Sequence, residues 1–133
     1  MSLVVLDTDA ASALLRRRDT TRLTSLLAGH IVAVTFVTVG EMTKWTLVRH
    51  WGSDRRENLQ RLLDSFVTLP YDSTVAVRWG QIQAAAQLRG RPRPVNDSWV
   101  AACCLARDLP LITLNTKDYI DFAEHDGLNL LRT

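Results

Sequence analysis

The stretch VVLDTDAASALLRRR, residues 4–18, contains the features that decide the fold of this chain. With Leu3 before it, its apolar start predicts a buried strand over residues 3–7, and helical spacing of alanine and leucine follows. Two carboxylates, Asp7 and Asp9, stand where the strand gives way to the helix. Desolvating an unpaired charge costs several kcal/mol or more. Either a cation lies beside these carboxylates, or they cap the following helix. We expect Thr8 or Asp9 to be the cap, which leaves Asp7 without a structural role.

The bulk composition predicts an ordinary globular protein. The 133 residues are enough for one domain, 1–133, with 47% hydrophobic and 23% charged residues. No apolar run approaches the roughly 20 residues of a membrane span, and the start lacks the basic segment of a signal peptide. We therefore expect a cytoplasmic protein. The two cysteines, Cys103 and Cys104, are adjacent in a predicted helix, which argues against a disulfide or a zinc site.

The net charge of +2 does not by itself indicate nucleic acid. The kind of basic residue is more informative, because Lys44 and Lys117 are the two lysines and the other 14 of the 16 basic residues are arginine. Arginine binds phosphate and carboxylate groups through two parallel hydrogen bonds. The arginines favour RNA or an acidic partner, although a GC-rich coding sequence would give the same bias.

Strands and helices alternate along the chain, which predicts an α/β sandwich with a central, mostly parallel sheet of four to five short strands. Ligands in such folds lie beyond the carboxyl ends of the strands. The predicted strands cover residues 3–7, 31–35, 67–69, 109–114 and 128–131. The predicted helices cover residues 8–17, 20–28, 36–51, 54–66, 72–89 and 96–108, and a turn covers residues 115–119.

Glu41 falls on the apolar side of its predicted helix. Val37, Trp45 and Val48 are spaced to lie on the same face, so the carboxylate is directed inward. Glutamate is almost never fully buried unless it is paired. An arginine partner or a place at the edge of the apolar stripe would also explain this position.

Two further aspartates have both a structural and a functional explanation. Asp97 opens an almost wholly apolar helix, where it, Asn96 or Ser98 serves equally well as a cap. Asp118 follows a buried strand, and aspartate is common in turns. Three or four carboxylates in one pocket would raise each other's pKa unless a cation intervened. Hard oxygen ligands suit Mg²⁺ or Mn²⁺, which activate water for displacement at phosphorus.

Four segments carry a resemblance to a known family. They are LDTDAASALL (6–15), VGEM (39–42), YDSTVAVRWGQIQAAAQLRGRP (71–92) and NDSWVAACCLARDLPLITLNTKDY (96–119). Together they resemble the PIN-domain ribonucleases, and more narrowly the VapC toxins of bacterial type II toxin–antitoxin modules. The resemblance extends from about residue 3 to residue 131. The segments are specific to the family only in combination, because each one alone is too short to identify it.

The resemblance implies a PIN-like α/β/α sandwich that cuts tRNA or ribosomal RNA with one or two Mg²⁺ or Mn²⁺ ions. It also implies a homodimer and a cognate VapB-type antitoxin. The family's four acidic positions, both metal-binding and catalytic, fall on Asp7, Glu41, Asp97 and Asp118. Its supporting polar positions fall on Thr8, Thr113 and Asn115, and Asp9 stands where Asn or Ser is frequent.

Several readings remain in competition. A metal-dependent DNA nuclease or phosphatase, or a non-catalytic RNA-binding module, is an alternative to the endoribonuclease. Four arginines are candidates for RNA contacts, or else belong to a solvated face: Arg16, Arg49, Arg91 and Arg93.

We expect dimer contacts in the 36–66 region, because Trp45, Trp51 and Leu59 are more large apolar side chains than a small core readily buries.

Overall fold

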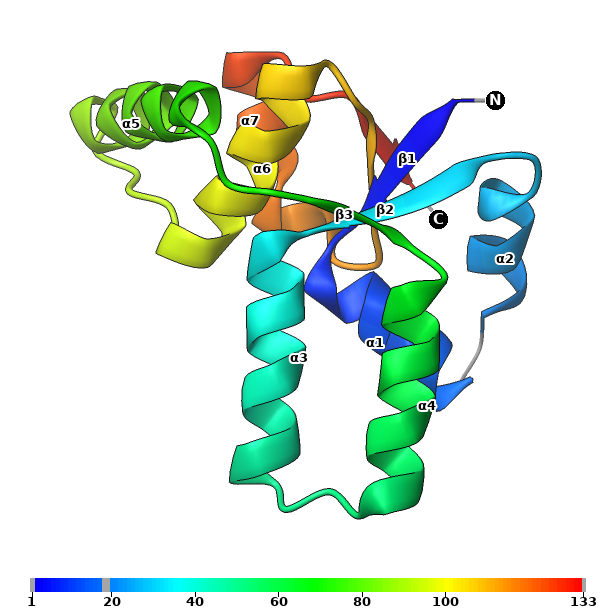
Figure 1. Ribbon diagram of the computed structural model, residues 1–133. Coiled ribbons are helices and arrows are strands. Elements are labelled where there is room, and N and C mark those ends of the chain that lie inside the picture. Colours follow the sequence, from blue (N-terminus) through cyan, green and yellow to red (C-terminus); the bar gives the residue numbers. More distant parts are fainter. Residues whose placement is uncertain (1, 18–19, 133) are drawn as a thin grey trace.

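Five parallel strands form the central sheet of this computed structural model, which describes residues 2–17 and 20–132 (Figure 1). Their order across the sheet is β3-β2-β1-β4-β5. The strands are β1 (Leu3–Leu6), β2 (Ile31–Thr35), β3 (Val67–Leu69), β4 (Leu111–Thr113) and β5 (Leu130–Arg132). β1 lies at the centre, hydrogen-bonded to β2 on one side and to β4 on the other.

Seven α-helices and one 3-10 turn connect these strands within the described residues. They are α1 (Thr8–Arg16), α2 (Thr21–Leu27), α3 (Phe36–Val48), α4 (Ser53–Asp64), α5 (Ser73–Leu88), α6 (Val95–Arg107), η1 (Thr116–Asp118) and α7 (Ile120–Asp126). The predicted α/β/α sandwich is confirmed. α3 and α4 extend together away from the sheet as an arm, at the bottom of Figure 1.

The alternation of side chains along the strands builds two cores, one on each face of the sheet. Val5 packs with α5, α6 and α7 in one core, whereas Val4 and Leu6 pack with α1, α2, α3 and α4 in the other. The central strands β1 and β4 are buried on both faces, as parallel strands usually are, whereas two of the three residues of the edge strand β3 are exposed. This burial fixes the direction of every residue that follows a strand at the carboxyl edge.

Most predicted boundaries differ from the observed ones by one or more residues, and for three elements the difference is described here. β1 ends at Leu6, because the side chain of Asp7 already caps α1. α3 ends at Val48, since His50 adopts a left-handed conformation with φ of 51° and Gly52 starts the next helix instead. The strand predicted over residues 109–114 is limited to Leu111–Thr113.

α7 was not predicted from the sequence. Its seven residues carry few apolar side chains, and only Phe122 and Asp121 are buried. Gly127, which ends the helix at φ of 83°, was the available signal. Within the described residues, no helix is both long enough and apolar enough to cross a membrane.

The argument for a dimer surface in the 36–66 region was wrong for two of its three residues. Trp51 and Leu59 are buried at 6% and 5% exposure in the core between the sheet and α1–α4. The large exposed apolar side chains of that region are instead Leu47 and Val48. The homodimer itself stays a prediction.

We expect Trp51→Ala to lower the free energy of unfolding by about 3–5 kcal/mol, because it leaves a large cavity in the core. Leu47→Ala is the matched control: Leu47 is 61% exposed, so its change stays within about 0.5 kcal/mol. Urea denaturation of the two variants tests this. Equal midpoints would mean that Trp51 lies on the surface in solution.

Candidate active site

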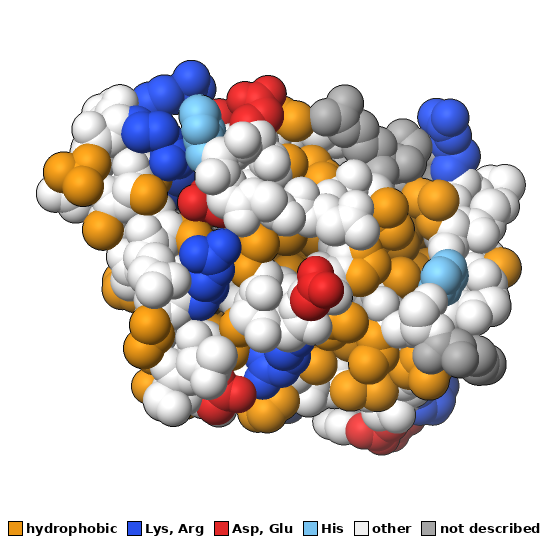
Figure 2. All heavy atoms as spheres, turned by 90° about the horizontal axis from the view of Figure 1, so that it is seen from above, with side chains coloured by type: hydrophobic (Ala, Val, Ile, Leu, Met, Phe, Trp, Pro, Cys, Tyr) orange, Lys and Arg blue, Asp and Glu red, His pale blue; other side chains and the backbone are white. Residues whose placement is uncertain are grey.

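The carboxyl edge of the sheet carries a small acidic cleft of about 80 Å³. It is lined by Asp7, Thr8, Asp9, Glu41, Trp45, Asp97, Asp118 and Tyr119. Residues from four separate parts of the sequence therefore meet at one place, and all four predicted acidic positions are among them. By contrast, acidic side chains on the face seen from above lie apart from one another (Figure 2).

Asp7 is held by both of its carboxylate oxygens. Oδ1 accepts a hydrogen bond from the backbone N–H of Ala10 at 2.9 Å, and Oδ2 accepts one from Oγ1 of Thr113 at 2.5 Å. Asp7 therefore caps α1, so the predicted cap at Thr8 or Asp9 was wrong, and so was the prediction that Asp7 has no structural role. Asp7 is only 2% exposed, and this burial raises its pKa from 3.8 to about 6 despite the two bonds.

Asp97 is the third residue of α6, and the residue that caps this helix is Pro94. The capping explanation of Asp97 is therefore wrong, and so is the start predicted at residues 96–98. The carboxylate is half-buried and accepts a long hydrogen bond, 3.4 Å, from the Tyr119 hydroxyl. Burial and the neighbouring carboxylates, Asp118 above all, raise the pKa of Asp97 to about 6.

Glu41 is connected to two buried threonines. Thr8 Oγ1 donates to Glu41 Oε1 at 2.8 Å and lies 2.9 Å from Thr38 Oγ1. A hydroxyl has one proton to donate, so Thr8 accepts from Thr38 while it donates to the carboxylate. Thr38 was not predicted as a supporting residue, although it precedes Glu41 by three residues and so shares its helix face.

Asn115 and Asp118 act together at the turn after β4. Asn115 Nδ2 donates to Asp118 Oδ2 at 2.6 Å, and the Asn115 backbone N–H donates to Thr113 Oγ1 at 2.9 Å. Asp118 lines the cleft, whereas Asn115 is not among its lining residues. Asn115, which the resemblance gave as a supporting polar position, thus fixes Asp118 through a hydrogen bond and does not line the cleft itself.

Two of the arginines predicted to contact RNA have another partner. Arg93 donates to Asp121 at 2.7 Å, and Arg91 lies 3.6 Å from the same carboxylate. The hydrogen bond from Arg93 lowers the pKa of Asp121. Asp121 also lies near Glu124 and His125 on α7. Because the two arginines already neutralise Asp121, we do not assign this cluster as a metal site.

The acidic cleft is chemically suited to a hard divalent cation. Its lining residues include five carboxylates and no lysine or arginine. No three of these carboxylates bring oxygens within 4.8 Å of one another in the described part of the chain. That spacing is expected of uncompensated negative charges, and the pKa values of Asp7 and Asp97 are raised by burial first and by the neighbouring carboxylates second. Oxygen ligands alone favour Mg²⁺ or Mn²⁺ over softer metals.

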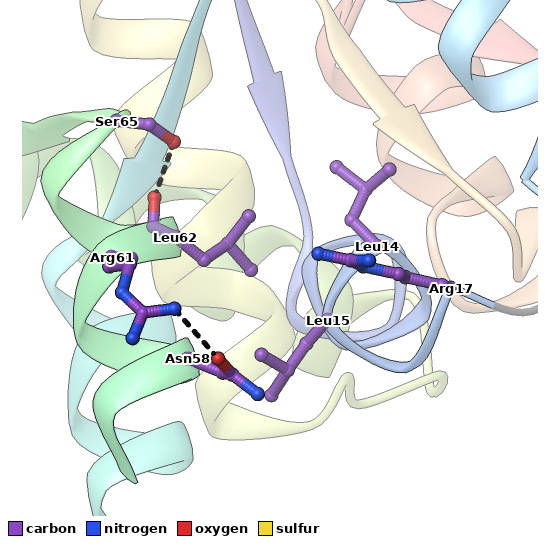
Figure 3. A pocket seen from close by; sticks show the side chains of 7 residues that line it. All are labelled: Leu14, Leu15, Arg17, Asn58, Arg61, Leu62 and Ser65. Carbon is purple, nitrogen blue, oxygen red and sulfur yellow. Dashed lines mark hydrogen bonds between the residues drawn. The ribbon is translucent and has the colours of Figure 1, made fainter. Parts of the chain in front are cut away.

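A separate groove of about 290 Å³ lies between α1 and α4 (Figure 3). Leu14, Leu15 and Leu62 give it an apolar floor, and Arg17 and Arg61 stand at its sides. An adjoining cavity of about 140 Å³ is lined by Leu15, Arg16, Trp51, Arg55 and Asn58. Arg16 therefore lines this adjoining cavity and not the acidic cleft.

Comparison with known proteins identifies the family. The PIN-domain profile matches residues 4–127. Ribonuclease VapC5 of Mycobacterium tuberculosis is 34% identical over 98 residues, which is 72% of this chain and 70% of that protein.

Solved structures of toxin–antitoxin complexes have the same fold as this chain. VapBC2 of Rickettsia felis, bound to a DNA fragment from its promoter, superposes with a TM-score of 0.85 at 18% identity, covering 100% and 99% of the two chains. VapBC-5 of Mycobacterium tuberculosis gives 0.75 at 28% identity, covering 98% of each. The chain belongs to the PIN-domain family, and within it to the VapC type.

Substitution of Asp97 by Asn tests how the negative charge of the metal-free cleft affects the free energy of unfolding. The folded-state pKa of about 6 exceeds the ordinary 3.8, so the native state binds the proton more tightly than the unfolded chain. Stability is then lost as pH rises from about 4 to 6. In EDTA at pH 7.5, Asp97→Asn should raise the free energy of unfolding by about 1 kcal/mol after solvent screening, and by nothing near pH 3.5.

Asp108→Asn provides the control, because Asp108 is an exposed helix-ending residue at φ of 54°, where Asn is well tolerated. Its effect should stay within about 0.5 kcal/mol at both pH values. Thermal or urea unfolding at the two pH values measures the difference. A loss of stability for Asp97→Asn at pH 7.5 would mean that the carboxylate supports the fold.

Proposed function

We propose that this protein is a Mg²⁺- or Mn²⁺-dependent endoribonuclease toxin that hydrolyses phosphodiester bonds of tRNA or ribosomal RNA. The observation that supports this most strongly is the cleft of five carboxylates with no basic side chain among its lining residues. The ribonuclease VapC5 named above lends support through its sequence similarity. The metal requirement and the RNA class are parts of the proposal.

The proposal gives each acid a role. Asp7 and Asp97 hold the main cation. The pKa of each is raised, so a bound cation would relieve the cost of their charge, and both side chains extend from buried elements, β1 and α6. Asp118 completes the site or holds a second ion, and Asn115 keeps it in place. A bound divalent cation supplies water activation and neutralises charge developing on the phosphoryl group.

Glu41 has the role of orienting and deprotonating the attacking water. Thr8 donates to one carboxylate oxygen, Oε1, so the other oxygen is available to accept a proton from water. Attack by water, rather than by the ribose 2′-hydroxyl, leaves a 5′-phosphate and a 3′-hydroxyl. Mapping the ends of cleaved RNA therefore tests the chemistry directly.

Two other functions are compatible with an acidic cleft. A DNA nuclease or phosphatase would cut single-stranded DNA or a small phosphoester as fast as RNA. A non-catalytic RNA-binding module would bind RNA and leave it intact. The arginine-rich composition favours a polyanionic substrate over a small phosphoester. Parallel assays on these three substrates separate the possibilities.

We expect RNA cleavage to require Mg²⁺ or Mn²⁺ and to stop in excess EDTA. Asp7→Asn and Asp97→Asn should each lower the cleavage rate by at least about 100-fold while the protein stays folded. Asparagine remains a good helix cap, so Asp7→Asn keeps the bond from Ala10. The rate is measured on labelled RNA, with circular dichroism as the check on folding.

Asp108→Asn should cleave at the wild-type rate, because this exposed residue lies outside the cleft. Full activity in EDTA would contradict the metal requirement. Wild-type activity of either cleft variant would contradict its assignment as a ligand.

We further propose a VapB-type antitoxin as the partner, supported by the VapBC complexes among the structural neighbours. The groove between α1 and α4 combines an apolar floor with arginines, which suits a segment with apolar and acidic side chains. A homodimer also remains part of the proposal, without an assigned surface.

Arg61→Glu should weaken binding of a co-expressed VapB-type antitoxin by at least about tenfold, because it reverses a charge beside the groove. Arg22→Glu, an exposed residue of α2, should leave the affinity within about twofold. Calorimetric titration of each purified variant gives the affinities. Equal affinities for the two variants would place the antitoxin elsewhere.

A further inference from the structure

Two residues of α3 and the residue that ends it form a row that leads out of the acidic cleft. Glu41, Trp45 and Arg49 follow one another at intervals of four residues, the spacing that places side chains on one helix face. Glu41 and Trp45 both line the cleft. Arg49 ends the helix, about 12 Å along the helix axis from Glu41. The row therefore connects the proposed reaction centre to the outer part of the α3–α4 arm.

Trp45 and Arg49 are in direct contact. The Cζ atom of Arg49 lies 4.7 Å from the centre of the Trp45 ring, within the range of a cation–π interaction. Trp45 is half-buried and packs against the core, so the ring is a fixed support. A guanidinium stacked in this way keeps its N–H groups directed outward at low entropic cost.

Apart from the Trp45 ring, Arg49 has no partner for its charge among the described residues. Arg49 is exposed, and within residues 2–17 and 20–132 its side chain takes part in no ion pair or hydrogen bond. This distinguishes it from Arg91 and Arg93, which bind Asp121. It also distinguishes it from Arg107, which binds Asp72.

A polyanion approaching the cleft meets five carboxylates, which repel it. The cation required by the proposed function neutralises this charge at the scissile phosphate only. The flanking nucleotides need a separate source of positive charge close to the cleft, and single-stranded RNA is commonly held by basic side chains combined with aromatic rings. Arg49 and Trp45 supply this combination at one wall of the cleft.

We propose that the Trp45–Arg49 pair binds the nucleotide next to the scissile phosphate of single-stranded RNA. This inference rests on the proposed ribonuclease function. Arg49 donates hydrogen bonds to the phosphate of that nucleotide. Trp45 is the positioning residue: it orients the guanidinium, and its edge at the cleft wall contacts the ribose or base.

The chain contains a matched control pair. Arg55 is stacked on Trp51, with its Cζ atom 4.3 Å from the ring centre. Arg55 is also exposed, but Trp51 does not line the acidic cleft. Arg55→Ala therefore removes the same kind of arginine from the same kind of ring at a different place.

The first test is steady-state cleavage of a short single-stranded RNA at several salt concentrations. Arg49→Ala should raise KM by about 5–10-fold with kcat changed less than about twofold, because binding is lost and the reacting groups remain. Its salt dependence should correspond to one phosphate contact fewer, a slope smaller by about 0.7. Arg49→Lys should fall between Arg49→Ala and the wild type. Arg55→Ala should match the wild type.

The second test is tryptophan fluorescence of the EDTA-treated protein titrated with the same RNA, which needs no cleavage. RNA should quench the wild type, and Trp45→Phe should abolish most of that quenching although three tryptophans remain. Equal KM and salt slopes for Arg49→Ala and Arg55→Ala, or quenching retained in Trp45→Phe, would overturn the pair's role. A wild type that binds but never cuts RNA would instead contradict the proposed function and leave this inference supported by the quenching.

Discussion

The carboxylate of Asp7 is the point on which the fold and the site both depend. One oxygen accepts the Ala10 N–H and starts α1, while the other accepts the Thr113 hydroxyl and ties β1 to the neighbouring strand β4. Thr113 in turn accepts the N–H of Asn115, whose side chain holds Asp118. A single buried residue thus fixes a helix start, a strand contact and, through two further bonds, the turn that carries another acid. A structural role and a metal-binding role coexist in Asp7, since the two bonds leave carboxylate lone pairs available.

The acidic cleft shows how stability and chemistry oppose each other in this protein. Burial at the carboxyl edge, and in second place the neighbouring carboxylates, raises the pKa of Asp7 and Asp97 and therefore costs folding free energy at neutral pH. The two cores on either side of the sheet compensate by burying apolar side chains on both faces. Neutral hydrogen-bond donors support the acids: Thr8 and Thr38 at Glu41, Thr113 at Asp7, and Tyr119 at Asp97. Neutral donors orient the carboxylates without a cation that would compete with a metal.

Much of this arrangement follows from local patterns in the sequence. The strands at residues 31–35 and 67–69 and the long helix α5 were predicted correctly, because strand and helix patterns are local signals. The convergence of the four acids on one cleft was predicted from the places of Asp7 and Asp118 after strands, of Glu41 on an inward helix face and of Asp97 at a helix start. The hydrogen bond from Thr113 to Asp7 was not predicted, because the two residues are 106 positions apart in the sequence. The ion pairs of Arg91 and Arg93 were missed for the same reason, as their partner Asp121 lies on the unpredicted α7. Burial of Trp51 depended on how α3 and α4 pack, which periodicity alone does not determine.

Two helices begin at the acidic cleft, and this has an electrostatic consequence. α1 starts directly after Asp7, and Asp97 stands in the first turn of α6. The peptide dipoles of a helix sum to about half a positive charge at its amino end. The cleft therefore receives positive potential from the backbone itself, which neither titrates with pH nor diffuses away. This fixed potential partly offsets the repulsion among the acids. It also leaves their oxygens free to bind a cation, whereas a lysine or arginine at the same place would itself bind those oxygens.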